Sequence, residues 1–131
     1  MYLTNIKGDR MEHLVEQSKE DYLEAILMIR EEQGYVRSTD IAKKLNVTKP
    51  SVTYITKKLK DQNLIEMDKN NMIVLTETGE KIATEIFTRH KILTDFFVSI
   101  GVSKNQAQLD ACQVEHAISK ETFNCIKKRM K

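Results

Sequence analysis

Hydrophobic residues recur at helical spacing along most of the chain, which predicts a mainly α-helical protein. The first such segment begins at Ser18, a residue type favoured at helix N-caps, and ends at Gly34. Its apolar positions are Tyr22, Leu23, Ile26, Leu27 and Ile29. Residues before Ser18 show no clear period. We therefore expect residues 1–17 to form a loosely ordered arm or a short extension of this helix.

Two short amphipathic segments follow, joined by a tight turn. Residues 38–45 predict a capped helix whose inner face carries Ile41, Ala42 and Leu45. Residues 48–59 predict a second helix, with Pro50 in the first turn, where a missing amide proton does little harm. Its inner stripe is Val52, Ile55 and Leu59. Two short helices around a tight turn are typical of the helix-turn-helix motif.

A β-hairpin is predicted directly after this motif. Leu64–Met67 and Met72–Leu75 favour strands, and the turn-forming residues 68–71 separate them. A hairpin that follows a helix-turn-helix is a wing. The pattern therefore predicts a winged helix-turn-helix domain over residues 18–76.

The second half of the chain predicts a helical domain over residues 77–131. A long helix from Thr78 to about Ile100 carries the stripe Ile82, Ile86, Leu93, Phe96, Phe97 and Ile100. So much apolar surface needs more cover than the chain supplies, so we expect a homodimer. Ser103 with Gln106 predicts a capping box for the next helix, and Ser119 opens a last one.

The charge distribution indicates a polyanionic partner. Between Arg37 and Asn63 seven basic side chains oppose two acidic ones, although the net charge of the chain is only +2. On a helix-turn-helix, such a surface predicts contact with double-stranded DNA. We expect five residues to contact base edges: Thr48, Lys49, Pro50, Ser51 and Tyr54. We expect four others to contact phosphates: Arg37, Lys44, Lys57 and Lys58.

Cys112, Glu115 and His116 lie three and four residues apart, so one helix face would present a sulfur, an oxygen and a nitrogen ligand. Each residue alone is better explained as a buried thiol, a solvated carboxylate or a hydrogen-bonded imidazole. His90, Asp21 and Glu24 are further candidates, but spacing alone cannot bring separate helices together. Cys125 has no such neighbours and is expected in the core, and His13 is expected at the surface.

Several motifs then occur in one order: Ser-x-Glu-Asp-Tyr-Leu-Glu from residue 18, Leu-Thr-x-x-Gly from residue 75, Arg-His at residues 89–90, and Cys-x-x-Glu-His from residue 112. Together with the winged motif, this order resembles the metal-dependent repressors of the diphtheria-toxin-repressor family, especially its short manganese-transport-regulator branch. The resemblance extends from about Ser18 to about Met130.

The resemblance implies a homodimeric repressor that binds a DNA operator when a divalent metal, Mn(II) or Fe(II), joins the first helix to the dimerisation helices. The matching ligand positions are Asp21, Glu24, His90, Cys112, Glu115 and His116. This set combines features of both branches. Cys112 matches the iron branch, where the manganese branch commonly has Glu, whereas Asp21 stands where the iron branch has Met. Thr94 and Gln108 replace ligands of the iron branch's ancillary site, and no SH3-like domain is expected.

The sequence also bears on location and on two alternative functions. No apolar run is long enough to cross a bilayer, and no signal-peptide pattern occurs, so a cytoplasmic protein is expected. One alternative is a metal-independent winged-helix regulator in which the Cys-Glu-His cluster is structural. Another is a small hydrolase or redox enzyme with Cys112 as nucleophile and His116 as base, which lacks a glycine-rich oxyanion loop. We therefore expect that the protein is not an enzyme.

Overall fold

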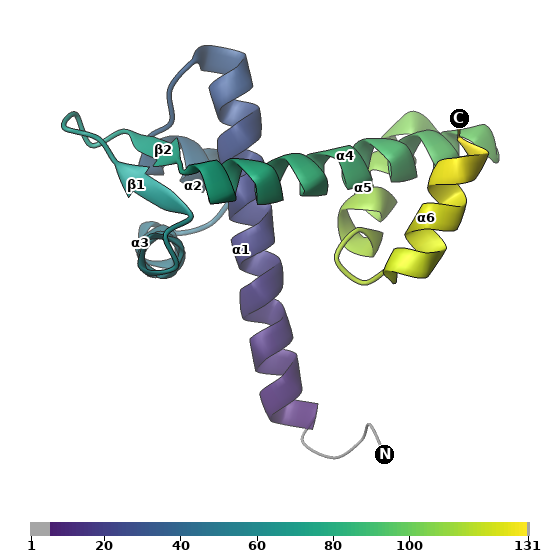
Figure 1. Cartoon of the computed structure of the whole chain (residues 1–131), viewed down its shortest axis with the longest axis horizontal. Coiled ribbons are helices and arrows are strands. Elements are labelled where there is room, and N and C mark those ends of the chain that lie inside the picture. Colours follow the sequence, from purple (N-terminus) through teal and green to yellow (C-terminus); the bar gives the residue numbers. More distant parts are fainter. Residues whose placement is uncertain (1–5, 131) are drawn as a thin grey trace. The chain divides into compact units, whose positions relative to one another are not determined.

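The computed structural model describes residues 6–130, and of residues 6–13 the backbone only. It is mainly helical with one two-stranded antiparallel hairpin, which confirms the expected fold class (Figure 1). The elements in order are α1 (Ile6–Gln33), α2 (Ser38–Leu45), α3 (Lys49–Asp61), β1 (Ile65–Met67), β2 (Ile73–Leu75), α4 (Glu77–Ser99), α5 (Lys104–Val114) and α6 (Lys120–Arg129).

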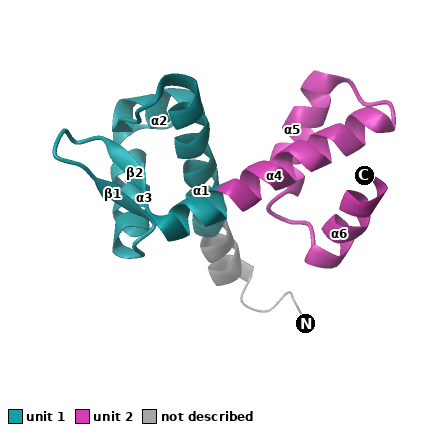
Figure 2. Ribbon diagram, turned by 45° about the horizontal axis from the view of Figure 1, so that its top comes forward, with its two compact units in different colours: residues 1–83 teal, residues 84–131 magenta. Residues whose placement is uncertain are grey.

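The chain divides into two compact units, one ending at Ala83 and one beginning at Thr84 (Figure 2). The boundary lies inside α4, so the first turns of this long helix belong to the first unit. The sequence pattern places the change at residues 76–77 instead, where α4 begins. The difference arises because α4 is continuous across the boundary between the units.

The first unit is the expected winged helix-turn-helix. Asn46 adopts the left-handed conformation (φ 54°) at the C-cap of α2, which makes the tight turn into α3. Pro50 lies in the first turn of α3, and Val52, Ile55 and Leu59 are buried. The wing pairs Ile65 with Leu75 and Met67 with Ile73. The Ile73 amide of its second strand also donates a hydrogen bond of 2.8 Å to the carbonyl of Val36, in the segment before α2.

Helix α1 extends back beyond Ser18. It starts at Ile6, so residues 6–17 form its first turns, and residues 1–5 lie outside the described part of the chain. The expectation that Ser18 is the N-cap is therefore wrong, because Ser18 lies well inside the helix. The predicted apolar face is confirmed: Tyr22, Leu23, Ile26, Leu27 and Ile29 are all buried.

The second unit has its own apolar core. Leu93 of α4, Ala111 of α5 and Phe123 of α6 are buried together. Around them pack Ile92, Phe97, Val114, Ile118 and Ile126. Ser103 and Ser119 cap α5 and α6, each accepting a hydrogen bond from the backbone three residues later. The Ser103 half of the expected capping box is present, and the Gln106 side-chain amide nitrogen donates to Asp110 at 2.8 Å.

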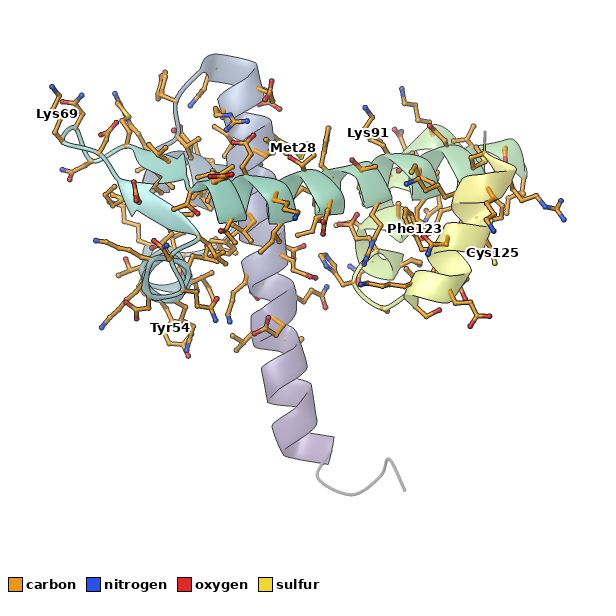
Figure 3. All side chains as sticks on the ribbon, in the orientation of Figure 1. Met28, Tyr54, Lys69, Lys91, Phe123 and Cys125 are labelled. Carbon is orange, nitrogen blue, oxygen red and sulfur yellow. The ribbon has the colours of Figure 1, made fainter. Side chains whose placement is uncertain are left out.

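Two predictions about this unit are wrong. Cys125 is exposed on α6 and is not a core residue, whereas Phe123 of the same helix is buried (Figure 3). Ile100 ends the predicted apolar stripe of α4, yet it follows the helix and is largely exposed. Within residues 6–130, no helix is both long and apolar enough to span a membrane.

Candidate metal centre and DNA-binding surface

Glu115 is a buried acid at the end of α5. Only 1% of its surface is exposed, and it occupies the C-cap position with helical dihedral angles (φ −58°, ψ −27°). Oε2 lies 3.1 Å from Nδ1 of His90 on α4, and Oε1 lies 3.4 Å from Nε2 of His116. A buried carboxylate needs compensating charge or hydrogen bonds, and here two imidazoles face it.

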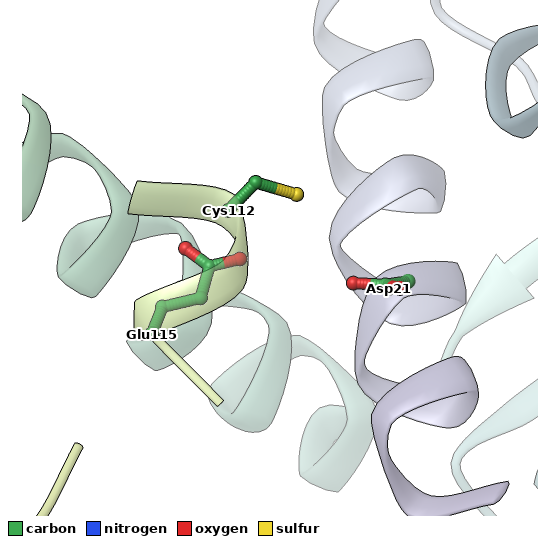
Figure 4. A group of neighbouring side chains, drawn as sticks. All are labelled: Asp21, Cys112 and Glu115. Atoms are coloured by element: carbon green, nitrogen blue, oxygen red, sulfur yellow. The ribbon is translucent and has the colours of Figure 1, made fainter. Parts of the chain in front are cut away.

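Cys112 adds a thiol to this cluster. Its Sγ and a carboxylate oxygen of Glu115 lie within 4.8 Å of each other, and both residues are carried by α5 (Figure 4). Helix α5 ends at Val114, so His116 lies in the turn that follows and not on the expected helix face. The turn brings the imidazole to the carboxylate all the same. The structure thus gathers His90, Cys112, Glu115 and His116 within one unit.

The donor set fits a divalent transition metal. Oε1 of Glu115 is fully buried and has no hydrogen-bond partner within residues 6–130, so it retains acceptor capacity. Imidazole nitrogen, carboxylate oxygen and thiolate sulfur together are ligands of Mn(II), Fe(II), Co(II) and Zn(II). These residues could therefore hold such a cation, and the thiol favours the softer members of the series.

Asp21 and Glu24 lie three residues apart on α1, in the first unit, and therefore share one face of that helix. Glu24 is buried and Asp21 is half-buried, although both are acidic. Between them, burial raises the pKa of the Tyr22 phenol and keeps that group neutral. Two partly or fully buried acids on one turn are unusual for a helix that serves only as structure.

The predicted DNA-binding residues gather around α3. Lys49, Pro50, Ser51, Tyr54 and Lys57 are exposed along this helix, and Tyr54 projects from it with 55% of its surface accessible (Figure 3). The ammonium of Lys58 lies over the Tyr54 ring, 4.9 Å from its centre. Thr48 is the N-cap of α3, and its hydroxyl accepts a hydrogen bond from the Ser51 amide.

Arg37 and Lys44 lie next to this helix, at the start and end of α2. Both are exposed, and the Arg37 guanidinium lies 5.2 Å from the centre of the Tyr35 ring. Lys44 makes a 3.2 Å ion pair with Glu32 of α1. Arg37 and Lys44 are therefore accessible to solvent, which the predicted phosphate contacts would need.

Two family models together match nearly the whole chain. The iron-dependent repressor N-terminal DNA-binding domain matches residues 13–72, and the iron-dependent repressor metal-binding and dimerisation domain matches residues 76–131. The chain belongs to the family of iron-dependent repressors. As a member of this family it is a metal-dependent, DNA-binding transcriptional regulator and not an enzyme, so the hydrolase alternative is wrong.

Individual members of this family are similar over most of the chain. The HTH-type transcriptional regulator MntR of Shouchella clausii (strain KSM-K16) is 39% identical over 109 residues, 83% of this chain and 76% of that protein. The transcriptional regulator MntR of Escherichia coli O157:H7 is 38% identical over 108 residues, 82% of this chain and 70% of that one. The resemblance found in the sequence is thereby confirmed.

Solved structures agree. The metal-dependent transcriptional regulator MtsR aligns with a TM-score of 0.79 and 26% identity, and a manganese-dependent transcriptional repressor in complex with manganese aligns with 0.77 and 26%. Each alignment covers 86% of this chain, which spans about half the length of those two proteins (53% and 52%). The winged motif and the helical second half both belong to this shared fold.

One residue beside the cluster is not identified by the sequence reasoning. Arg89 of α4 donates a hydrogen bond of 3.1 Å from its guanidinium to the backbone carbonyl of Glu115. The only sequence signal is its place directly before His90 in the Arg-His motif. Spacing could not reveal a contact across 26 residues.

Proposed function

We propose that this repressor senses Mn(II) or Fe(II) through six ligands: Asp21, Glu24, His90, Cys112, Glu115 and His116. The observation that carries the proposal is the Glu115 carboxylate, buried and faced by two imidazoles, with a thiol nearby. Asp21 and Glu24 on α1 complete the set in this proposal. When bound, the metal supplies the positive charge that allows three carboxylates to remain ionised together.

The consequence we infer is a link between DNA binding and metal. Asp21 and Glu24 stand on the helix that packs against α2 and α3, whereas the other four ligands stand in the helical unit. Sharing one ion would restrict how the two units move, and in a homodimer it would fix the spacing of the two copies of α3, the helix expected at base edges. Half-sites about 34 Å apart would then be engaged together. A ligand shifts such an equilibrium only by binding one arrangement better.

Mn(II) is the leading candidate for the metal. Two relatives are named MntR, one solved relative is described as manganese-dependent, and five of the six proposed ligands carry nitrogen or oxygen donors. The Cys112 thiol pulls toward Fe(II), Co(II) or Zn(II). The regulated genes would be those of metal homeostasis, and a cytoplasmic location follows from a regulator that must meet both DNA and the intracellular metal pool.

The test begins with DNA selected in vitro by the wild-type protein in the presence of Mn(II). Gel-shift titration of that DNA should show much tighter binding with Mn(II) than with EDTA. His116→Ala should lose the difference, while Gln113→Ala, an exposed neighbour on α5, should keep it. Equal affinity in Mn(II) and EDTA would contradict the proposal. A metal response unaltered in His116→Ala would instead support a structural Cys-Glu-His cluster.

A further inference from the structure

Arg89 and His90 both contact Glu115, one at its backbone carbonyl and the other at its carboxylate. The Arg89 guanidinium donates to the Glu115 backbone carbonyl at 3.1 Å, and His90 Nδ1 lies 3.1 Å from the Glu115 carboxylate. Successive residues of a helix point roughly 100° apart. Glu115 is therefore bracketed by two adjacent side chains of α4, one on its main chain and one on its side chain.

The carbonyl that Arg89 contacts lies at the C-terminal end of α5. The last four carbonyls of a helix lack intrahelical partners, and Glu115 is the C-cap residue of α5. The turn that follows carries His116 and is closed by the amides of Ala117 and Ile118 on the Val114 carbonyl, at 3.0 and 2.9 Å. A cationic donor on a terminal carbonyl holds the position and direction of this turn.

A second contact keeps Arg89 itself in place. Its guanidinium lies 5.4 Å from the centre of the Phe123 ring, and Phe123 is buried in the core of the second unit. A planar guanidinium can stack its face on an aromatic ring while its N–H groups donate hydrogen bonds in the plane. A lysine ammonium cannot make both contacts in this way. Arg89 therefore connects α4, the end of α5 and α6.

From this geometry we infer that Arg89 is a positioning residue for the metal centre: it fixes the main chain at Glu115 so that the Glu115 carboxylate and the His116 imidazole stay directed at one point. The inference rests on the proposed function, because it presumes that these two side chains are ligands. Partners that orient metal ligands typically contribute a factor of about 10–100 to metal affinity.

The test compares Arg89→Met with Lys91→Met in the full chain. Lys91 lies on the other side of His90 and places its ammonium 5.3 Å from the centre of the Phe87 ring, so its substitution removes a similar contact away from Glu115. Arg89→Met should weaken Mn(II) binding by about 10–100-fold in calorimetric titration. Lys91→Met should leave it within about twofold of wild type, and Arg89→Lys should recover part of the loss, because one donor and the charge remain.

A spectroscopic measurement separates positioning from general stability. At saturating Co(II), the d–d bands of Arg89→Met should differ in position from those of wild type, because they report ligand geometry, and those of Lys91→Met should not. Unchanged Mn(II) affinity and an unchanged Co(II) spectrum in Arg89→Met would overturn the inference. If Arg89→Met does not fold, wild-type affinity and spectrum in Arg89→Lys would overturn it, and a weakened, altered site would support it.

Failure of the proposed function would look different. Wild-type protein without saturable Mn(II) binding, or with binding insensitive to His116→Ala, would overturn both proposals. Wild-type binding that depends on His116 and is indifferent to Arg89 would overturn the positioning role alone.

Discussion

At the residue scale, the buried Glu115 is contacted through both its side chain and its main chain. His90 and His116 face its carboxylate, and Arg89 contacts its carbonyl. Burying a carboxylate this completely costs several kcal/mol unless charges or hydrogen bonds compensate it. Such an arrangement fits the proposed cation site, in which the Cys112 thiol would influence which metal binds best.

Replacing Cys112 by Glu should shift the metal preference toward Mn(II). A thiolate favours Zn(II) over Mn(II) more strongly than a carboxylate does. The ratio of Mn(II) to Zn(II) dissociation constants should fall by about tenfold, or about 1.4 kcal/mol. Competition titration against a metallochromic chelator measures the ratio. Cys125→Ser, at the exposed cysteine of α6, is the control. The same change in both variants, or none in Cys112→Glu, would speak against a thiolate ligand.

The ion pair between Arg30 of α1 and Glu80 of α4 predicts a pH dependence of stability. Two contacts of 2.6 and 2.7 Å join the groups. The hydrogen bond from Arg30, helped by the Arg30 charge and partly opposed by burial, lowers the pKa of the Glu80 carboxyl below its ordinary value of 4.5. The contribution is therefore complete above pH 4.5 and is lost as the pH falls through the lowered pKa.

Glu80→Gln should accordingly be less stable than wild type at neutral pH by up to about 1 kcal/mol, after allowance for solvent screening of a half-exposed pair. The difference should hold down to about pH 5 and should shrink at lower pH, as urea unfolding at several pH values would reveal. Glu77→Gln, also in the first turn of α4, shares the helix-dipole effect and serves as control. A difference that does not change with pH would argue against the pair.

At the element scale, the join between the wing and α4 depends on a close approach. The Thr76 amide donates to the Leu64 carbonyl at 3.0 Å, and the Gly79 amide donates to the Thr76 hydroxyl at 3.0 Å. A Cβ atom on Gly79 would overlap the Leu64 carbonyl oxygen. The Leu-Thr-x-x-Gly motif therefore has a packing reason: only glycine lets the first turn of α4 lie against the start of the wing.

Gly79→Ala is expected to destabilise the protein by about 1–3 kcal/mol, since backbone must move to admit the methyl group. Helix propensity alone predicts the opposite sign, a gain of about 1 kcal/mol from alanine inside a helix. Chemical denaturation measures the difference, with Thr78→Ala at the exposed neighbouring position as control. A stabilised Gly79→Ala protein would show that the close approach is absent in solution.

At the scale of the whole molecule, each unit has its own core, and apolar surface remains on the second. Val98, Ile100 and Leu109 are exposed there, Ile100 and Leu109 each to 64%. Exposed apolar residues can contribute to an association surface when they lie together. The second family model describes a dimerisation domain over the same residues, so this surface is where we expect two copies of the chain to meet.

Leu109→Glu should shift the protein from dimer to monomer at micromolar concentration, because dimerisation would bury the new charge. Sedimentation velocity reports the change, and affinity for the selected DNA should fall with it. Val74→Glu places the same charge at an exposed apolar position of the wing, in the first unit, and should leave the dimer intact. A dimeric Leu109→Glu protein would place the interface elsewhere.

The amino-acid sequence by itself determined the element order and the winged motif. These depend on local rules: the spacing of apolar residues, capping serines and threonines, and the turn residues of the wing. The full set of candidate ligands came from the order of motifs that resembles the metal-dependent repressors, since spacing alone groups only Cys112, Glu115 and His116. Boundaries were less well determined. Helix α1 extends back to Ile6 although its first turns have no hydrophobic period, because a helix can continue without a buried face once it is nucleated.

Only the tertiary structure decided which side chains meet. Helix α5 stops at Val114, so His116 reaches Glu115 from a turn and not along a helix face. Cys125 is exposed although cysteines are most often buried, and Arg89 joins Glu115 across 26 residues. The physical reason is that local propensity acts over a few residues, whereas burial and hydrogen bonding between helices depend on how the whole unit packs.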